Sequence, residues 1–241
     1  MSRPSATVVL VHGAWHGAWC FAALQDALDQ RGVPSYAIDL PGHGTSTAPL
    51  SDLHGDAAHV VAVLDRLAAP SVLVGHSYGG AVISHAAAGR ADVGHLVYLA
   101  AFALYGGESV MGFLAGQPRA EVALSAAMRP GADGCSVLDP VAAVPALYGD
   151  CDTAAVAAAV ARLSPQPMST MTQEVHGDAL VTVRSTYVRC LRDAAVHPTH
   201  QATMAARCTA SIDLDCDHSP FLSRTADIAD LLAATAHEVA A

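Results

Sequence analysis

The chain has 241 residues, 52% of them hydrophobic, and 12 Lys+Arg against 22 Asp+Glu give it a formal net charge of -10. This length favours one domain with an insertion, and the hydrophobic content excludes a disordered chain. An acidic surface does not attract nucleic acid or an anionic membrane, so we expect neither as a partner. All 12 basic residues are arginine, which excludes a Walker-A phosphate loop and a Schiff-base lysine.

Six cysteines are spread without a C-x-x-C or the paired spacing of a zinc site. We therefore expect reduced, mostly buried thiols, no metal and no cofactor. The first residues, MSRP, lead into an apolar run at 6–11 that is too short for a signal peptide or a membrane span. These features predict a cytoplasmic protein, as a monomer or a homodimer.

The first hundred residues alternate short β-branched runs with helical periodicity, which is typical of a doubly wound, mostly parallel sheet covered on both faces. Helices are predicted before Gly32 and before Pro70, where apolar residues recur at helical spacing. Strands are predicted at 7–11, 35–38, 71–74 and 95–100. Farther along, we expect strands at 183–191 and 209–214 and helices at 198–206 and around Ile228, Leu231 and Leu232.

Between residues 103 and 179 this rhythm breaks into pieces rich in Gly, Pro and Ala, with a helical run at 153–162. A poorly ordered connection is one interpretation. The alanine-rich helix and the interspersed Leu, Val and Met favour a packed lid instead. The predicted organisation is an α/β core formed by residues 1–102 and 180–241 with a lid inserted at 103–179.

The segment GHSYG at residues 75–79 follows the apolar run 71–74 and opens into a predicted helix. A serine at a tight strand-to-helix turn is exposed, and glycines on either side let the neighbouring backbone pass without a clashing Cβ. The same letters also fit a glycine-rich turn with a helix-capping serine. The strand and helix context favours Ser77 as a catalytic nucleophile.

An activated serine needs a histidine base and a carboxylate that orients the base, in the chain order serine, acid, histidine for doubly wound hydrolases. Among 13 histidines, His218 combines a loop after a predicted strand with the last position in this order. Asp193 follows the preceding strand and is the predicted acid. Asp213, Asp215 and Asp217 crowd the histidine loop, so a carboxylate from this group stays an alternative.

Two backbone amides are needed to stabilise the negative oxygen of an acyl-transfer intermediate, and one comes from the residue after the nucleophile. Tyr78 is that residue. The second amide is predicted at Ala14, because HGA at 12–14 ends an early strand with a glycine that lets the backbone turn inward. A simple tight turn is the alternative interpretation of this glycine.

The predicted lid carries four of the six methionines, and flexible thioethers suit an adaptable apolar pocket, although ordinary lid core is an equal alternative. These are Met111, Met128, Met168 and Met171, accompanied by Phe113, Leu114 and Leu147. We expect Trp15, Met111, Phe113 and Met168 to contact the substrate. The net charge of the chain favours neutral or hydrophobic esters over anionic ones.

Four segments resemble the α/β-hydrolase fold, in the branch that contains plant methyl esterases, plant hydroxynitrile lyases and related bacterial esterases. They are VLVHGAWHGAW at 9–19, DLPGHG at 39–44, GHSYGG at 75–80 and DHSPF at 217–221. The resemblance covers nearly the whole chain. It implies Ser77 as nucleophile, His218 as base, Asp193 as acid, and the amides of Ala14 and Tyr78 as oxyanion hole.

The lyases of this branch carry a threonine after the first-strand histidine and a lysine after the catalytic histidine, where this chain has Gly13 and Ser219. Without a cation to stabilise departing cyanide, the resemblance favours hydrolysis over cyanohydrin cleavage. The predicted function is a serine carboxylesterase that acts on a small-molecule ester. An acyltransferase or tailoring enzyme using the same acyl-serine, and a non-catalytic ligand-binding relative, remain alternatives.

Overall fold

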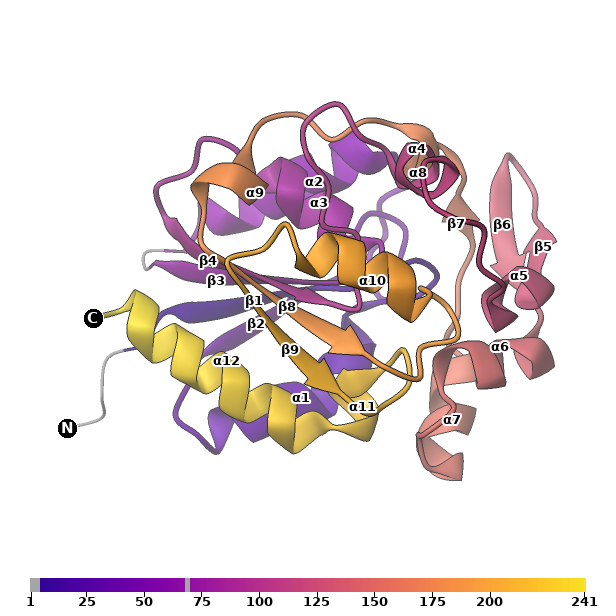
Figure 1. Ribbon diagram of the computed structural model, residues 1–241. Coiled ribbons are helices and arrows are strands. Elements are labelled where there is room, and N and C mark those ends of the chain that lie inside the picture. The colour runs from indigo at the N-terminus through magenta and orange to yellow at the C-terminus, as the bar shows by residue number, and fades with distance from the viewer. Residues whose placement is uncertain (1–4, 68–69) are drawn as a thin grey trace.

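The computed structural model describes residues 5–67 and 70–241, and its centre is a six-stranded sheet in the order β2-β1-β3-β4-β8-β9 (Figure 1). All neighbouring strands of this sheet pair in parallel. The strands are β1 (Thr7–Val11), β2 (Ser35–Ile38), β3 (Ser71–His76), β4 (Val93–Leu99), β8 (Ser185–Cys190) and β9 (Ala210–Leu214). Residues 1–4 (MSRP), which entered the prediction that there is no signal peptide, lie outside the described residues.

Helices cover both faces of the sheet. On one face lie α1 (Ala22–Asp29) and α12 (Thr225–Val239), and on the other lie α2 (Leu53–Leu64), α3 (Gly79–Ala86) and α10 (Pro198–Ala205) (Figure 1). Two short helices, η1 (Ala18–Phe21) and α11 (Pro220–Ser223), precede α1 and α12. The doubly wound α/β fold predicted from the sequence is confirmed.

Alternation along the strands builds the two halves of the core. Val9 and Val11 of β1 pack with α2 and α3, whereas Val8 and Leu10 pack with α1 and α12. Successive side chains of a strand point to opposite faces, so a sheet covered on both faces needs an unbroken apolar run. Each fully buried Val or Leu stabilises the fold by roughly 1.5–3 kcal/mol.

The predicted strands agree with the observed ones within two residues, and the predicted helices are present. The helix before Pro70 begins earlier than its apolar periodicity indicated, at Leu53. Its start is set by Asp52, whose side chain accepts a hydrogen bond from the Gly55 amide at 2.9 Å. A cap of this kind satisfies an otherwise unpaired amide of the first helical turn.

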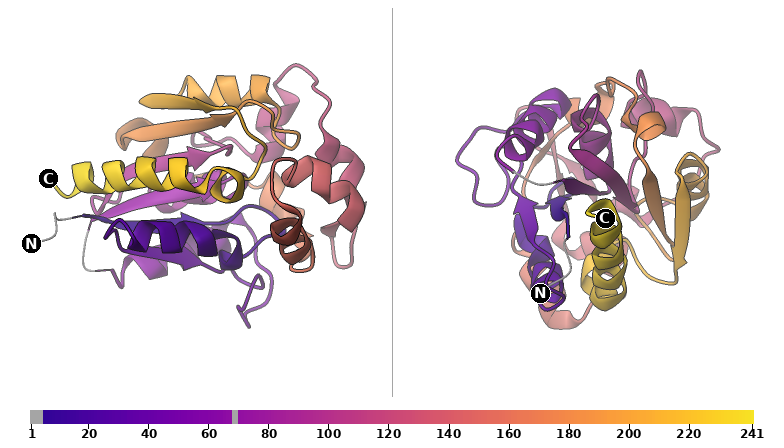
Figure 2. Two further views of the ribbon diagram at one scale, coloured as in Figure 1. Left: turned by 90° about the horizontal axis from the view of Figure 1, so that it is seen from below. Right: turned by 90° about the vertical axis from the view of Figure 1, so that its left-hand side faces the viewer.

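Most of the segment between β4 and β8 lies at the carboxyl ends of the strands, opposite the chain termini, whereas its last helix, α9 (Ala179–Thr182), packs against α3 just before the chain enters β8 (Figures 1 and 2). The segment holds α4 (Val110–Ala115), α5 (Ala123–Ala127), β5 (Met128–Pro130), β6 (Cys135–Leu138), α6 (Pro140–Leu147), α7 (Thr153–Val160), β7 (Gln166–Pro167), α8 (Ser169–Thr172) and α9. The helix predicted at 153–162 is α7. The antiparallel sheet β5-β6-β7 was not predicted.

The lid boundaries at 103 and 179 stay a prediction. In the described part of the chain, no helix combines the length and apolar character needed to cross a membrane.

Candidate active site

Ser77 lies in the turn between β3 and α3 with a backbone φ of +52°. This left-handed conformation costs a non-glycine residue about 1–2 kcal/mol, and such strain concentrates at functional sites. A Cβ on Gly75 would lie 2.5 Å from the carbonyl oxygen of Gly79, and one on Gly79 would lie 2.5 Å from that of Val11. The turn therefore requires glycine on both sides of the serine.

His218 and Asp193 are adjacent and buried, on the loops that follow β9 and β8. The Nδ1 of His218 lies 2.7 Å from the Oδ2 of Asp193. Because a carboxylate only accepts, Nδ1 carries the proton and Nε2 presents its lone pair. The histidine is thus held in the tautomer that a general base for a serine requires.

The three other candidate carboxylates are engaged elsewhere. Asp213 pairs with Arg189 at 3.2 Å, and Asp215 pairs with Arg192 at 2.7 Å. Asp217 is buried, but it accepts hydrogen bonds from the Ser223 hydroxyl at 2.7 Å and the Asp150 amide at 3.1 Å.

Four donors surround the Asp193 carboxylate. Its Oδ1 accepts from the amides of Ala195 at 2.7 Å and Val196 at 2.8 Å. Its Oδ2 accepts from the Nε2 of Gln201 at 2.8 Å in addition to His218. Hydrogen bonds of this number stabilise a buried negative charge. Gln201 of α10 was missed by the sequence analysis, because a buried glutamine carries no motif of its own.

His76, the residue before Ser77, ties the histidine loop to the turn. Its Nε2 donates to the carbonyl oxygen of His218 at 2.9 Å, and the two rings lie 4.6 Å apart. Burial lowers the pKa of His76 well below its usual range. This ring therefore stays neutral and connects the turn that carries Ser77 to His218.

The loop after β1 is held by two further neutral histidines. His12 donates through Nδ1 to the carbonyl of Gly13, and His16 donates through Nδ1 to the carbonyl of Ala14, both at 2.8 Å. The Nε2 of His16 accepts from the Tyr148 hydroxyl at 2.7 Å. Burial lowers the pKa of His12 to about 3 and that of His16 to about 4. The loop that carries the Ala14 amide is thus anchored on both sides.

Gly13 packs directly against the nucleophile turn. A Cβ at this position would lie 2.8 Å from the Nδ1 of His76 and 2.9 Å from the Cβ of Ser77. Ala14, Ser77 and Tyr78 line one cavity. The two predicted oxyanion-hole residues therefore meet beside the predicted nucleophile.

We expect Gly13→Ala to lower kcat for ester hydrolysis by about 10²–10³-fold, the cost of losing one oxyanion donor, because the added methyl group displaces the loop from Ser77. Initial rates and the melting temperature are measured together. Gly149→Ala is the control, since a Cβ there meets nothing closer than 3.9 Å. An unchanged kcat in Gly13→Ala would contradict this role of the loop.

The cavity beside Ser77 has a volume of about 400 Å³ and a largely apolar lining. The four methionines of the predicted lid all contribute to it, as do Trp15, Leu114 and the charged side chain of Arg119. The lining does not include Phe113, whose ring packs edge-on against Phe102 at 6.4 Å. Of the four predicted substrate-binding residues, Trp15, Met111 and Met168 line the cavity and Phe113 supports its wall from behind.

Tyr78 is anchored by a buried carboxyl group that the sequence analysis did not identify. Its hydroxyl donates to the Oδ2 of Asp56 at 2.7 Å, and Asp56 is 1% exposed. Burial raises the pKa of Asp56 to about 7, against the smaller opposing effect of the Tyr78 hydrogen bond. A group that is neutral below this pH therefore positions the residue after Ser77.

Asp56 predicts a specific pH dependence of stability. Its pKa is raised on folding, so its contribution is complete below about pH 4 and is lost as the pH rises through about 7. We expect the free energy of unfolding to fall by roughly 4 kcal/mol across this window through Asp56 alone. Denaturant titrations should show that Asp56→Asn lacks this fall. The exposed Asp26→Asn is the control, and parallel pH profiles for all three proteins would refute the assignment.

Several known proteins are similar to this chain in sequence or in structure. The profile of the alpha/beta hydrolase family matches residues 8–231. An alpha/beta hydrolase of Aspergillus novofumigatus is 29% identical over 238 residues, 92% of each chain. A carbendazim hydrolyzing esterase of Nocardioides sp. is 39% identical over 118 residues, 45% of this chain and 47% of that protein. The crystal structure of a pyrethroid hydrolase from Sphingobium faniae superposes with a TM-score of 0.85 and 26% identity, covering 96% of this chain and 97% of that one.

Proposed function

Because the chain belongs to the alpha/beta hydrolase family, we propose that it is a serine carboxylesterase for small to medium, largely apolar or aromatic esters. A carbendazim hydrolyzing esterase and putative methylesterases among the relatives support ester hydrolysis. The observation that carries the proposal is the buried hydrogen bond of 2.7 Å between His218 and Asp193. It lies beside a strained serine turn that opens into an apolar cavity.

In the proposed mechanism, the Oγ of Ser77 attacks the ester carbonyl carbon while its proton passes to the Nε2 of His218. Asp193 stabilises the imidazolium that forms. The amides of Ala14 and Tyr78 stabilise the negative oxygen of the tetrahedral intermediate. His218 then gives the proton to the leaving alcohol, and Ser77 keeps the acyl group as an ester.

The second half of the cycle uses the same groups. His218 takes a proton from a water molecule as the water oxygen attacks the acyl carbon, and the collapse of this intermediate returns the proton to Ser77. A carboxylic acid leaves, and the free enzyme is restored. His218 thus serves as base and acid in each half, which requires the single tautomer that Asp193 maintains.

The cavity supports the substrate class. Its volume of about 400 Å³ lies in the range of small-molecule sites, and its methionines provide an adaptable apolar surface. The apolar lining supports a largely apolar ester, and relatives that hydrolyse carbendazim and pyrethroids support a small-molecule substrate. We propose that the segment 103–179 acts as the lid over this cavity and that the protein works in the cytoplasm.

The proposal is tested by initial rates on p-nitrophenyl esters of increasing acyl length, together with labelling by a fluorophosphonate. We expect turnover with an optimum at an acyl length that fills the cavity, and covalent label on Ser77 alone. An alcohol or amine that outcompetes water as acceptor would redirect the proposal to acyl transfer. Tight binding of an ester without turnover or labelling would overturn catalysis in favour of a binding role.

A further inference from the structure

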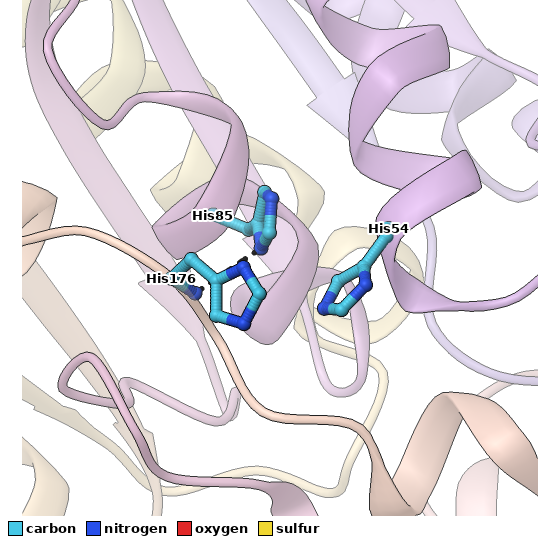
Figure 3. Close-up of side chains that lie close together, drawn as sticks. All are labelled: His54, His85 and His176. Atoms are coloured by element: carbon cyan, nitrogen blue, oxygen red, sulfur yellow. Dashed lines mark hydrogen bonds between the residues drawn. The ribbon is translucent and has the colours of Figure 1, made fainter.

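Three histidines from separate segments meet outside the substrate cavity (Figure 3). His54 lies in the first turn of α2, His85 lies near the end of α3, and His176 lies on the segment between α8 and α9. One nitrogen of each ring lies within 4.8 Å of the others. The distance between ring centres is 4.9 Å for His54 and His85, 4.6 Å for His54 and His176, and 5.3 Å for His85 and His176.

We infer that His54, His85 and His176 form a binding site for a divalent cation of the zinc class. Three imidazoles on one tetrahedral zinc have ring centres about 5 Å apart, because the Zn–N bond is about 2.1 Å and the ring centre lies about 1.1 Å beyond the nitrogen. The observed separations match this spacing. Nitrogen ligands select Zn²⁺, Ni²⁺, Cu²⁺ or Co²⁺ over Mg²⁺ and Ca²⁺, which require oxygen.

Hydrogen bonds to the backbone orient two of the rings. The Nε2 of His54 donates to the carbonyl of Glu174 at 2.9 Å, so its Nδ1 keeps a free lone pair. Such a bond from the second nitrogen is the usual support of a metal-binding histidine. The Nδ1 of His85 accepts a long hydrogen bond of 3.2 Å from the amide of His176. Its lone pair thus points toward the segment that supplies the third ligand, and a coordination bond would replace this contact.

The segment that carries His176 is tied to the start of α2. The Gln173 side chain accepts from the Leu53 amide at 2.8 Å and donates to the Asp52 carboxylate at 3.0 Å. These contacts hold the backbone beside His176 next to the start of α2, which carries His54. The nearby carboxylate of Asp52 and the net charge of -10 favour a cation at this surface.

The site is distinct from the catalytic residues. His85 lies six residues after Gly79, the first residue of α3, which is about 9 Å along the helix from the end next to Ser77. Because His176 is exposed, a fourth position stays open to water. The ion would join α2, α3 and the segment that leads from the proposed lid back to the core. Its role is therefore to stabilise this junction rather than to take part in ester cleavage.

The test is calorimetric titration of Zn²⁺ into the full chain, prepared without an affinity tag and stripped of metal. We expect one ion per chain, four-coordinate Co²⁺ absorption bands on substitution, and a melting temperature raised by about 5–10 °C at a hundredfold excess over Kd. His176→Ala, at an exposed loop position, should weaken Kd at least tenfold. His59→Ala removes a histidine of the same helix α2 outside the cluster and should bind as the wild type does.

Two outcomes would overturn the inference. Equal zinc affinity of His176→Ala and the wild type would show that the cluster does not bind the ion, and an equal loss in His59→Ala would show binding by scattered histidines. His54→Gln provides a second removal of a ligand from another segment. Circular dichroism of each variant separates loss of the site from loss of the fold.

Discussion

Replacing Ser77 by alanine is expected to lower kcat for ester hydrolysis by at least about 10⁴-fold while the fold is kept. In the proposed mechanism the Oγ of Ser77 forms the covalent bond to the acyl group, and alanine has no hydroxyl group to form it. The backbone at this position already has a φ of +52°, so alanine carries the same strain as serine. Stability and substrate binding should therefore change little.

The measurement compares initial rates on a p-nitrophenyl ester with the melting temperature of each protein. Ser125→Ala is the matched control, because this serine lines the same cavity but lies outside the nucleophile turn. We expect its rate to stay within a few-fold of the wild type. Equal rates for Ser77→Ala and the wild type would exclude acyl-serine catalysis.

Asp193→Asn is expected to lower kcat by about 10⁴-fold, as the loss of the orienting carboxylate does in serine hydrolases. The Oδ2 of Asp193 accepts from both His218 and Gln201. The carboxylate accepts two hydrogen bonds at each of its two oxygens, but an asparagine side chain has only one oxygen that can accept. Its NH₂ group would face a donor, which favours the wrong tautomer of His218.

Asp217→Asn tests whether the carboxylate next to His218 in the sequence has this orienting role instead. Asp217 accepts from the Ser223 hydroxyl and the Asp150 amide, so its loss should destabilise the fold by about 1–3 kcal/mol. Its kcat should stay within a few-fold of the wild type. The reverse pattern, a large loss of rate in Asp217→Asn and a small one in Asp193→Asn, would transfer the role of the acid to Asp217.

Features encoded by neighbouring residues could be derived from the sequence by itself. The apolar strands depend on the alternation of side chains along each strand, and the glycines at 75 and 79 depend on steric exclusion within one turn. Both features were predicted correctly. Four short segments carried the resemblance to the α/β-hydrolase fold, and the family profile that matches residues 8–231 confirms it. His218 could be proposed because chain order and a strand-end loop restrict the choice among the 13 histidines.

The tertiary structure decided which distant side chains meet. It brings Asp193, rather than Asp217, to His218, adds Gln201 and Asp56, and leaves Phe113 out of the cavity lining. It also joins the strands of the sheet β5-β6-β7 and gathers three histidines from separate segments. Such partners depend on how elements pack across the molecule, and no periodicity within a single segment records that packing.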